Sequence, residues 1–327
     1  MRHVLEVRDL CVAYGGRDGG VWRALDRVSF TVRAGEILGV LGESGSGKST
    51  LAAALVRLLP PNGRITGGKI LLEDSDLCRV DAAELRRVRG SGVSIVFQEP
   101  SLALHPTICI GEQVGEVLRA HGASDKCERG ERALEILARV FSRDADRMFS
   151  SYPHQLSGGQ QQRALIAQAI ACDPALVIAD EPTASLDPTT QREILTLFQS
   201  LRDRFGIAFV FITHNPALLA GFADRALVLY AGKVAELGPT QAVLFSPQHP
   251  YTQALLRCMP TVAGEGARSR KELLPVIAGA PPSLAVLSRG CVFEPRCEKR
   301  MDSCQVSEPM AALLDGGHEV ACLRFPT

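Results

Sequence analysis

A glycine-rich segment of the sequence has the composition and spacing of a phosphate-binding loop. Residues 42–49 read GESGSGKS and fit the pattern G-x-x-x-x-G-K-[ST], with an apolar run at 36–41 before them and helical spacing at 49–59 after them. Glycines allow backbone N–H groups to converge on phosphate oxygens, and a helix N-terminus adds partial positive charge. This context favours a nucleotide site over a merely flexible Gly/Ser loop.

The polar side chains of this loop have distinct expected roles. Lys48 would reach the β- and γ-phosphates, and the Ser49 hydroxyl would bind Mg²⁺. The residues that we predict to contact nucleotide here are Gly42, Ser44, Gly45, Ser46, Gly47, Lys48, Ser49 and Thr50.

Two carboxylates end an apolar run further along the chain. Residues 176–181 read LVIADE, which predicts a buried strand that ends in Asp180 and Glu181. Asp180 would bind Mg²⁺ directly or through water, and Glu181 is placed to polarise an attacking water. Such a pair is common by itself, but a complete phosphate loop upstream favours the catalytic interpretation.

The elements that must position these residues alternate between strands and helices. Apolar runs predict strands at 4–14, 24–33, 36–41, 93–97, 175–179, 207–212 and 226–230. Helical spacing predicts helices at 49–59, 110–140 with an interruption around 122–130, 160–171 and 189–204. This alternation predicts an α/β fold with a mainly parallel sheet. Prolines become frequent after about Leu244, so we predict two domains, 1–245 and 246–327.

Composition narrows the class of protein. The 327 residues include 36 Lys plus Arg and 36 Asp plus Glu, and this zero net charge argues against a protein held on nucleic acid by phosphate neutralisation. With 46% hydrophobic residues, wholesale disorder is excluded. The sequence has no apolar run of 18 residues and no secretory leader pattern, so we expect a cytosolic protein whose scattered cysteines are mostly reduced.

A short segment upstream of the carboxylate pair points to one family. Residues 156–160 read LSGGQ and resemble the signature of ATP-binding-cassette (ABC) ATPases. The signature residues are Leu156, Ser157, Gly158, Gly159 and Gln160. Their chemistry agrees with the resemblance, because a serine hydroxyl, free backbone N–H groups and a helix N-terminus suit an anion. Taken alone, the segment is better explained as a serine N-cap beside a glycine turn, but the motifs around it favour the signature.

The resemblance, which covers about residues 4–245, implies roles for further residues. Tyr14 would stack on adenine, Gln98 would sense Mg²⁺ and the membrane subunit, and His214 would contact the γ-phosphate. The dimer-signalling loop would be Ser185, Leu186 and Asp187. The implied catalytic residues are Glu181, His214 and Lys48, and the implied Mg²⁺ ligands are Ser49, Gln98 and Asp180. The implied fold is a P-loop NTPase cassette with a mainly parallel core sheet, a helical subdomain and an antiparallel β subdomain.

In this family two cassettes meet head to tail. ATP then lies between the phosphate loop of one cassette and the signature of the other. The resemblance therefore implies a dimer that ATP closes and hydrolysis releases, because the γ-phosphate supplies contacts that exist only in the closed state.

The region after the cassette narrows the family further. Residues 249–256, HPYTQALL, resemble a segment of oligopeptide and dipeptide importer ATPases. A C-x5-C-x6-C-x17-C set follows, formed by Cys291, Cys297, Cys304 and Cys322. In that family these cysteines hold a [4Fe–4S] cluster, while the thiolates alone would equally suit structural zinc. Four unrelated reduced or disulfide-bonded cysteines are the remaining alternative. We expect a Cys-rich extension in which a cluster would act as a structural staple.

The sequence thus predicts the ATPase subunit of a bacterial importer for di- and oligopeptides at the cytoplasmic face of the inner membrane. The expected partners are a second, similar cassette, two transmembrane permeases and, indirectly, an extracytoplasmic binding protein, with no nucleic acid. Three alternatives stay open at this point. The same machine could carry nickel, opines or glutathione. The chain could be a non-transport ABC ATPase of DNA repair or translation, or it could be a regulatory or storage protein with a degenerate cassette.

Overall fold

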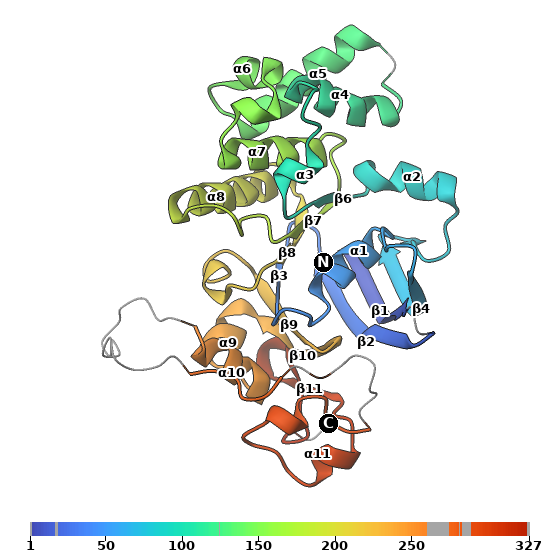
Figure 1. The fold of residues 1–327 in the computed structure, drawn as a ribbon, viewed down its shortest axis with the longest axis vertical. Coiled ribbons are helices and arrows are strands. Elements are labelled where there is room, and N and C mark those ends of the chain that lie inside the picture. Colours follow the sequence, from blue (N-terminus) through green and yellow to red (C-terminus); the bar gives the residue numbers. More distant parts are fainter. Residues whose placement is uncertain are drawn as a thin grey trace.

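The computed structural model describes residues 2–16, 19–123, 125–259, 275–280, 282 and 289–325 (Figure 1). The strands are β1 His3–Gly15, β2 Val21–Arg33, β3 Ile37–Leu41, β4 Gly63–Leu72, β5 Ser75–Asp76, β6 Val93–Val96, β7 Leu176–Asp180, β8 Ala208–Ile212, β9 Arg225–Tyr230, β10 Lys233–Pro239, β11 Ala311–Leu314 and β12 His318–Ala321. The helices are α1 Lys48–Leu55, α2 Ala82–Ser91, α3 Pro100–Ala103, α4 Ile110–Ala120, α5 Lys126–Val140, α6 Ala145–Ser150, α7 Gly158–Ala169, α8 Pro188–Phe205, α9 Thr240–Phe245, α10 Pro250–Arg257 and α11 Ser303–Val306.

The central sheet carries the strands that the apolar runs predicted. Its strand order is β11-β12-β10-β9-β3-β8-β7-β6. Strands β9, β3, β8, β7 and β6 are parallel to one another, whereas β10, β12 and β11 extend the sheet from β9 by antiparallel pairing. The predicted α/β fold with a mainly parallel sheet is therefore confirmed.

Both faces of this sheet are covered, which explains why its strands read as continuous apolar runs. In β8, Phe209 and Phe211 lie on one face, and both rings contact Phe198 of α8. Val210 and Ile212 pack on the other face, with α1 and the antiparallel strands. Since side chains alternate between the faces of a strand, a run without polar residues is the expected result.

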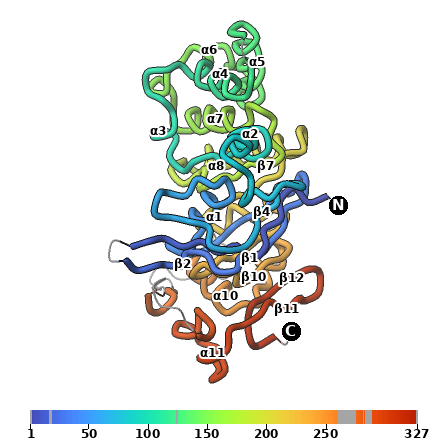
Figure 2. Tube along the Cα trace, turned by 90° about the vertical axis from the view of Figure 1, so that its right-hand side faces the viewer, coloured from blue at the N-terminus to red at the C-terminus, as the bar shows by residue number. Residues whose placement is uncertain are grey.

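A second sheet and a group of helices flank this core. The antiparallel sheet has the order β2-β1-β4-β5, and α1 packs in the apolar cluster between it and the central sheet. Helices α4, α5 and α6 gather at one end of the elongated molecule, and the C-terminal segment lies at the opposite end (Figures 1 and 2). The expected core sheet, helical region and antiparallel region are all present.

The C-terminal segment is attached to the central sheet. Strand β12 pairs with β10 through Glu236↔Val320 and Leu237↔Glu319, and β11 pairs with β12. The buried carboxylate of Glu236 accepts a hydrogen bond from His318 Nε2 at 2.7 Å and from the backbone N–H groups of Gln248 and His249. The domain boundary at 245/246 stays a prediction, and the sheet continues across it.

One predicted boundary differs from the structure, and β4 and α10 are among the elements that were not predicted. Helix α1 ends at Leu55 rather than at residue 59, because Arg57 adopts a left-handed conformation with φ of 52° that cannot continue a helix. Strand β4 was missed since several of its side chains are exposed and Gly67 and Gly68 interrupt its pattern. Helix α10 was missed in a proline-rich region, where Pro250 stands in its first turn and is tolerated there.

The ten cysteines are distributed from Cys11 to Cys322, and all are free. The expected Cys-rich C-terminal extension is therefore not shown, because the cysteines are scattered along the chain. Among the described helices, none combines the length and the apolarity that crossing a bilayer requires.

His249 makes the stability of the α10 region depend on pH. Its buried imidazole caps α10 by accepting a hydrogen bond from Tyr251 N at 3.0 Å, and burial lowers its pKa to about 4. Unfolded histidine titrates near pH 6.5, so the unfolded state binds more protons between these values, and stability falls as pH is lowered through that window. The loss amounts to about 3 kcal/mol at about 1.4 kcal/mol per pH unit.

His249→Asn keeps a side-chain acceptor for the cap and removes this titration. We expect the urea midpoint of the variant to fall less than that of the parent between pH 6.5 and 4.5. His3→Asn, at an exposed position, is the matched control and keeps the parental slope. Parallel curves for His249→Asn and the parent would contradict the assignment.

Candidate nucleotide-binding site

The glycine-rich loop connects β3 to α1, as its spacing predicted. Gly47 is the N-cap of α1 and has φ of 108°. A Cβ at this position would lie 2.8 Å from the backbone oxygen of Ala24, so both conformation and space demand glycine. Only glycine therefore allows the loop to follow this path into α1.

Lys48 is held at the centre of the loop. Its Nζ donates hydrogen bonds to the backbone oxygens of Gly42 at 2.8 Å and Glu43 at 2.9 Å. Burial lowers the pKa of Lys48, and the nearby charges of Glu181, Asp180 and Glu43 oppose that shift. The ammonium group is thus positioned for phosphate oxygens and is supported by carboxylates from a different strand.

Asp180 and Ser49 meet beside Lys48 and suit a magnesium ion. Burial is the main cause of a raised pKa at Asp180, while a hydrogen bond with Ser49 and the charge of Lys48 act in the opposite direction. The buried Oδ1 atom of Asp180 has no hydrogen-bond partner among the described residues. A carboxylate oxygen and a hydroxyl are ligands that Mg²⁺ accepts, so these two residues fit that ion.

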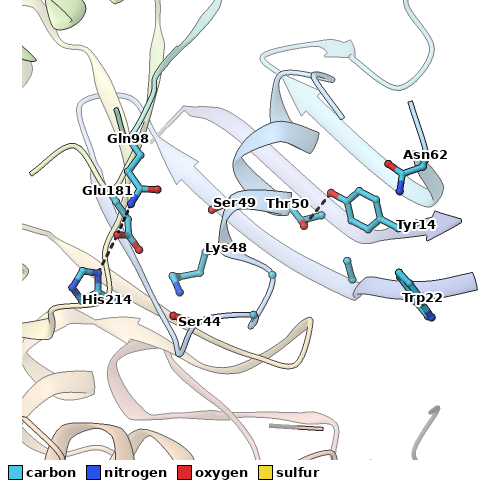
Figure 3. A pocket seen from close by; sticks show the side chains of 13 residues that line it. Tyr14, Trp22, Ser44, Lys48, Ser49, Thr50, Asn62, Gln98, Glu181 and His214 are labelled. Carbon is cyan, nitrogen blue, oxygen red and sulfur yellow. Dashed lines mark hydrogen bonds and ion pairs between the residues drawn. The ribbon is translucent and has the colours of Figure 1, made fainter. Parts of the chain in front are cut away.

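Glu181 occupies a strained position at the end of β7. Its φ is 46°, in the left-handed region that side chains rarely adopt, and its N–H donates to the oxygen of Ile212 at 3.0 Å. Its Oε2 atom accepts a hydrogen bond from Gln98 Nε2 at 3.4 Å and lies 3.1 Å from His214 Nδ1 (Figure 3). Strain of this kind persists where surrounding contacts maintain it, and it clusters at functional sites.

These groups face a cavity of about 860 Å³. Predicted residues that line it are Tyr14, Ser44, Gly45, Gly47, Lys48, Ser49, Thr50, Gln98, Glu181 and His214. Figure 3 shows Lys48 in the middle, with Gln98, Glu181 and His214 on one side and Tyr14 on the other. The structure thus brings together residues from opposite ends of the predicted cassette. Gly42, Ser46 and Asp180 support the loop and its neighbours without lining the cavity.

Three residues that line this cavity were not predicted from the sequence: Trp22, Ala24 and Asn62. Trp22 is 40% exposed and pairs across the strands with Tyr14. The hydroxyl groups of Tyr14 and Thr50 are 3.2 Å apart, which links this aromatic end to α1. An aromatic residue on each side of the glycine-rich loop 15–20 was the signal that could have identified Trp22.

The signature segment does not line this cavity. Ser157 caps α7, with its hydroxyl accepting from Gln160 N at 3.3 Å and Gln160 Oε1 accepting from Ser157 N at 3.0 Å. Ser157 and Gly158 remain exposed. A Cβ on Gly159 would lie 2.5 Å from Thr190 Cγ2, so glycine is required where α7 approaches α8. The segment is therefore held by its own capping hydrogen bonds and presents polar groups at the surface.

The segment 185–187 is also outside the cavity. Asp187 begins helix α8 by accepting hydrogen bonds from Thr189 N and Thr190 N, both at 3.0 Å. Leu186 lies against the signature, since a Cβ on Gly158 would come within 3.6 Å of its Cδ2. The two predicted dimer segments are thus neighbours in the fold.

The expected metal cluster in the C-terminal segment is not supported. Burial is the main cause of the pKa of Cys291 rising to about 11, and the nearby Cys304, Cys322 and Cys297 add to it. The four thiols are thus close enough to influence one another, yet no three metal-ligating side chains among the described residues are arranged to hold an ion. Cys291, Cys297, Cys304 and Cys322 are free cysteines, and the residues that the structure describes form no group that could hold a metal ion.

Two family descriptions match different parts of the chain. Residues 25–184 match the family described as ABC transporter, and residues 235–304 match the oligopeptide/dipeptide transporter C-terminal region. The first range contains the phosphate loop and the carboxylate pair, and the second contains helix α10 and three of the four C-terminal cysteines.

Similar proteins cover almost the whole chain. It is 42% identical to the oligopeptide transport ATP-binding protein OppD of Salmonella typhimurium over 96% of this chain and 91% of that protein. It is 40% identical to the dipeptide transport ATP-binding protein DppD of Escherichia coli over 98% of this chain and 96% of that protein.

Solved structures give the same picture for the cassette. The dimeric ATP-binding cassette MJ0796 in a post-hydrolysis state bound to ADP and phosphate is similar with a TM-score of 0.63 and 31% identity, covering 72% of this chain and 98% of that one. CbiO1 of Clostridium perfringens, part of an ABC transporter complex, is similar with a TM-score of 0.64 and 27% identity, covering 75% of this chain and 92% of that one.

Trp22 provides a direct test of the site, because it is the single tryptophan of the sequence and lines the cavity. We expect MgATP to produce a saturable change in tryptophan emission, since a bound nucleotide would alter the surroundings of a partly exposed indole. Lys48→Ala should raise the MgATP concentration at the midpoint of this titration at least about tenfold, which corresponds to a loss of about 1.4 kcal/mol in binding free energy. Trp22→Phe should abolish the signal. An unchanged emission under conditions where the chain retains nucleotide would contradict the placement.

Proposed function

We infer function from the premise that this chain belongs to the ABC transporter family of ATP-binding subunits. It is an ATPase of that family, and we propose that it energises the import of di- and oligopeptides through a bacterial inner-membrane transporter. The single observation that carries the peptide assignment is the joint match to the cassette and to the oligopeptide/dipeptide C-terminal region, together with relatives named for peptide transport at 40–42% identity.

The proposed hydrolysis uses side chains that already converge in the cavity. Lys48 binds the β- and γ-phosphates, and backbone N–H groups of the loop complete the phosphate contacts. Glu181 orients and polarises the attacking water, and His214, which contacts Glu181, holds the γ-phosphate end of the site. Mg²⁺, when bound at Ser49 and Asp180 with Gln98 nearby, supplies charge neutralisation between the phosphates. Tyr14 forms the adenine end.

The exposed signature supports a two-cassette arrangement. Ser157 and the first turn of α7 present a hydroxyl and free N–H groups at the surface, outside the cavity of their own chain. We propose that they complete the ATP site of a second, similar cassette, and that the loop 185–187 beside them transmits the state of that site. A heterodimer is the form we favour.

An apolar groove beside Gln98 supports docking of a membrane subunit. The groove has a volume of about 700 Å³ and lies between α2, β6, α3 and α7. Leu102 and Phe97, which line it, are 80% and 46% exposed. Exposed apolar side chains in a concave surface are typical of a protein interface. We therefore propose that two permeases dock here on the paired cassettes at the cytoplasmic face, with the extracytoplasmic binding protein on the other side.

The other candidate functions have less support. Import of nickel, opines or glutathione would use the same ATPase, because the ATPase subunit does not contact the solute. The match of residues 235–304 to the oligopeptide/dipeptide transporter C-terminal region favours transport over a role in DNA repair or translation. A degenerate cassette would have lost catalytic groups, whereas Lys48, Asp180, Glu181 and His214 are all present. We keep residues 1–245 as the nucleotide-binding domain and 246–327 as the extension.

Glu181→Gln tests the hydrolysis together with the transport assignment. In the membrane complex we expect ATPase activity to rise when the binding protein is loaded with a peptide. The Gln variant should lower kcat by about 10²–10⁴-fold, the range of a lost general base, and retain MgATP binding. Glu193→Gln, on the exposed side of α8, is the matched control with parental activity.

Two results would count against this function. If nickel, an opine or glutathione but not peptide stimulates the ATPase activity, the transported solute is that compound and not a peptide. If nucleic acid stimulates the ATPase activity and the chain does not copurify with permeases, the transport function is wrong.

The [4Fe–4S] cluster remains a proposal that rests on the family resemblance and on the spacing of the four cysteines. Elemental analysis of the anaerobically purified complex tests it. About four iron atoms per chain, lost on Cys297→Ser but kept on Cys172→Ser, is the expected result. One zinc per chain would assign the alternative metal, and the absence of both would leave four structural thiols.

A further inference from the structure

The phosphate loop is held from outside the cassette at one residue, Glu43. The carboxylate of Glu43 accepts two hydrogen bonds from Arg296, with Nη1–Oε2 at 2.8 Å and Nη2–Oε1 at 3.1 Å. Arg296 lies 253 positions further along the chain, in a short 3₁₀ helix, Glu294–Arg296, directly before Cys297. Paired N–H···O contacts between a guanidinium and a carboxylate are among the strongest and most directional in proteins.

The guanidinium of Arg296 is also held by hydrogen bonds to groups other than Glu43. Its Nε donates to the backbone oxygen of Ala278 at 3.0 Å, and Nη1 also donates to the hydroxyl of Tyr230 at 3.3 Å. Its side chain is 5% exposed. Such a group is preorganised, in contrast to a flexible surface cation.

A second contact reaches the backbone of the same loop residue. The N–H of Glu43 donates to the hydroxyl of Tyr251 at 2.9 Å. Tyr251 is fully buried in α10 and packs against Tyr230 and Phe293, with ring centroids 4.4 and 5.4 Å away. Phe293 belongs to the same turn as Arg296. The C-terminal segment therefore contacts both the side chain and the backbone of Glu43.

Glu43 in turn contacts the phosphate-binding lysine. Its backbone oxygen accepts from Lys48 Nζ at 2.9 Å and from Ser46 N at 3.1 Å. Its carboxylate is among the charges that act on Lys48. Without Arg296, that carboxylate would stand uncompensated beside a loop that must accept the highly charged phosphates of ATP, and it would compete for Lys48.

We propose that Arg296 is a positioning residue for the phosphate loop, which acts by neutralising and orienting Glu43. ATP affinity then depends on the fold of the cysteine-bearing segment, although that segment has no place in the cavity. Damage to this segment would weaken nucleotide binding before it altered the hydrolysis step.

The charge of Glu43 makes the proposal testable by a double-mutant cycle in the full-length chain. We expect Arg296→Ala to raise the Kd for MgATP about tenfold, or about 1.4 kcal/mol. Glu43→Gln in the Arg296→Ala background should restore the Kd to within about threefold of the parent, because the uncompensated charge is gone. In the assembled transporter, KM should follow the Kd while kcat stays within about twofold, since Glu181 and His214 are untouched.

Arg300→Ala is the matched control, because it removes an arginine of the same segment whose side chain is 62% exposed. It should leave the Kd unchanged. Two outcomes overturn the proposal: a Kd for Arg296→Ala within twofold of the parent, or a double variant that binds as weakly as Arg296→Ala, which would reveal a purely structural role. If Arg296→Ala does not fold, Arg296→Gln is subjected to the same two criteria.

Discussion

The structure depends on a buried positive charge at the start of α1. Lys48 is taken out of water by the loop that surrounds it, and an ammonium group in such a place must be compensated. Backbone oxygens of Gly42 and Glu43 contact it, and Asp180 and Glu181 act on it from β7. Binding of phosphate satisfies the same need, which explains why the loop, the carboxylates and the nucleotide form one electrostatic unit.

The central sheet places the members of this unit together. Strands β3, β7 and β8 run parallel and end at the same edge, so the residues that follow them meet there. The phosphate loop follows β3, Glu181 follows β7 and His214 follows β8. Apolar packing on both faces of the sheet fixes these ends, and Glu181 tolerates an unfavourable backbone conformation as a result.

The C-terminal segment is joined to both the central sheet and the phosphate loop. It adds two strands to the sheet and contacts the phosphate loop through Arg296 and Tyr251. In contrast, Ser157 and Gly158 of the signature are exposed and do not line the cavity of their own chain. One end of the nucleotide site is therefore supported within the chain, while the proposed function requires the other end to be supplied by a partner.

The sequence by itself determined the phosphate loop, the carboxylate pair, the capped signature helix and the mainly parallel sheet. These features are encoded in short segments, where spacing and apolar periodicity are sufficient. Only the tertiary structure revealed Trp22 and Asn62 in the cavity, the strands β11 and β12 on the central sheet, and the pair Arg296–Glu43. The metal site that the family resemblance implied is not supported, because no group of metal ligands is found among the described residues. Contacts between residues far apart in the chain leave no local pattern, because only the folded backbone decides which distant side chains become neighbours.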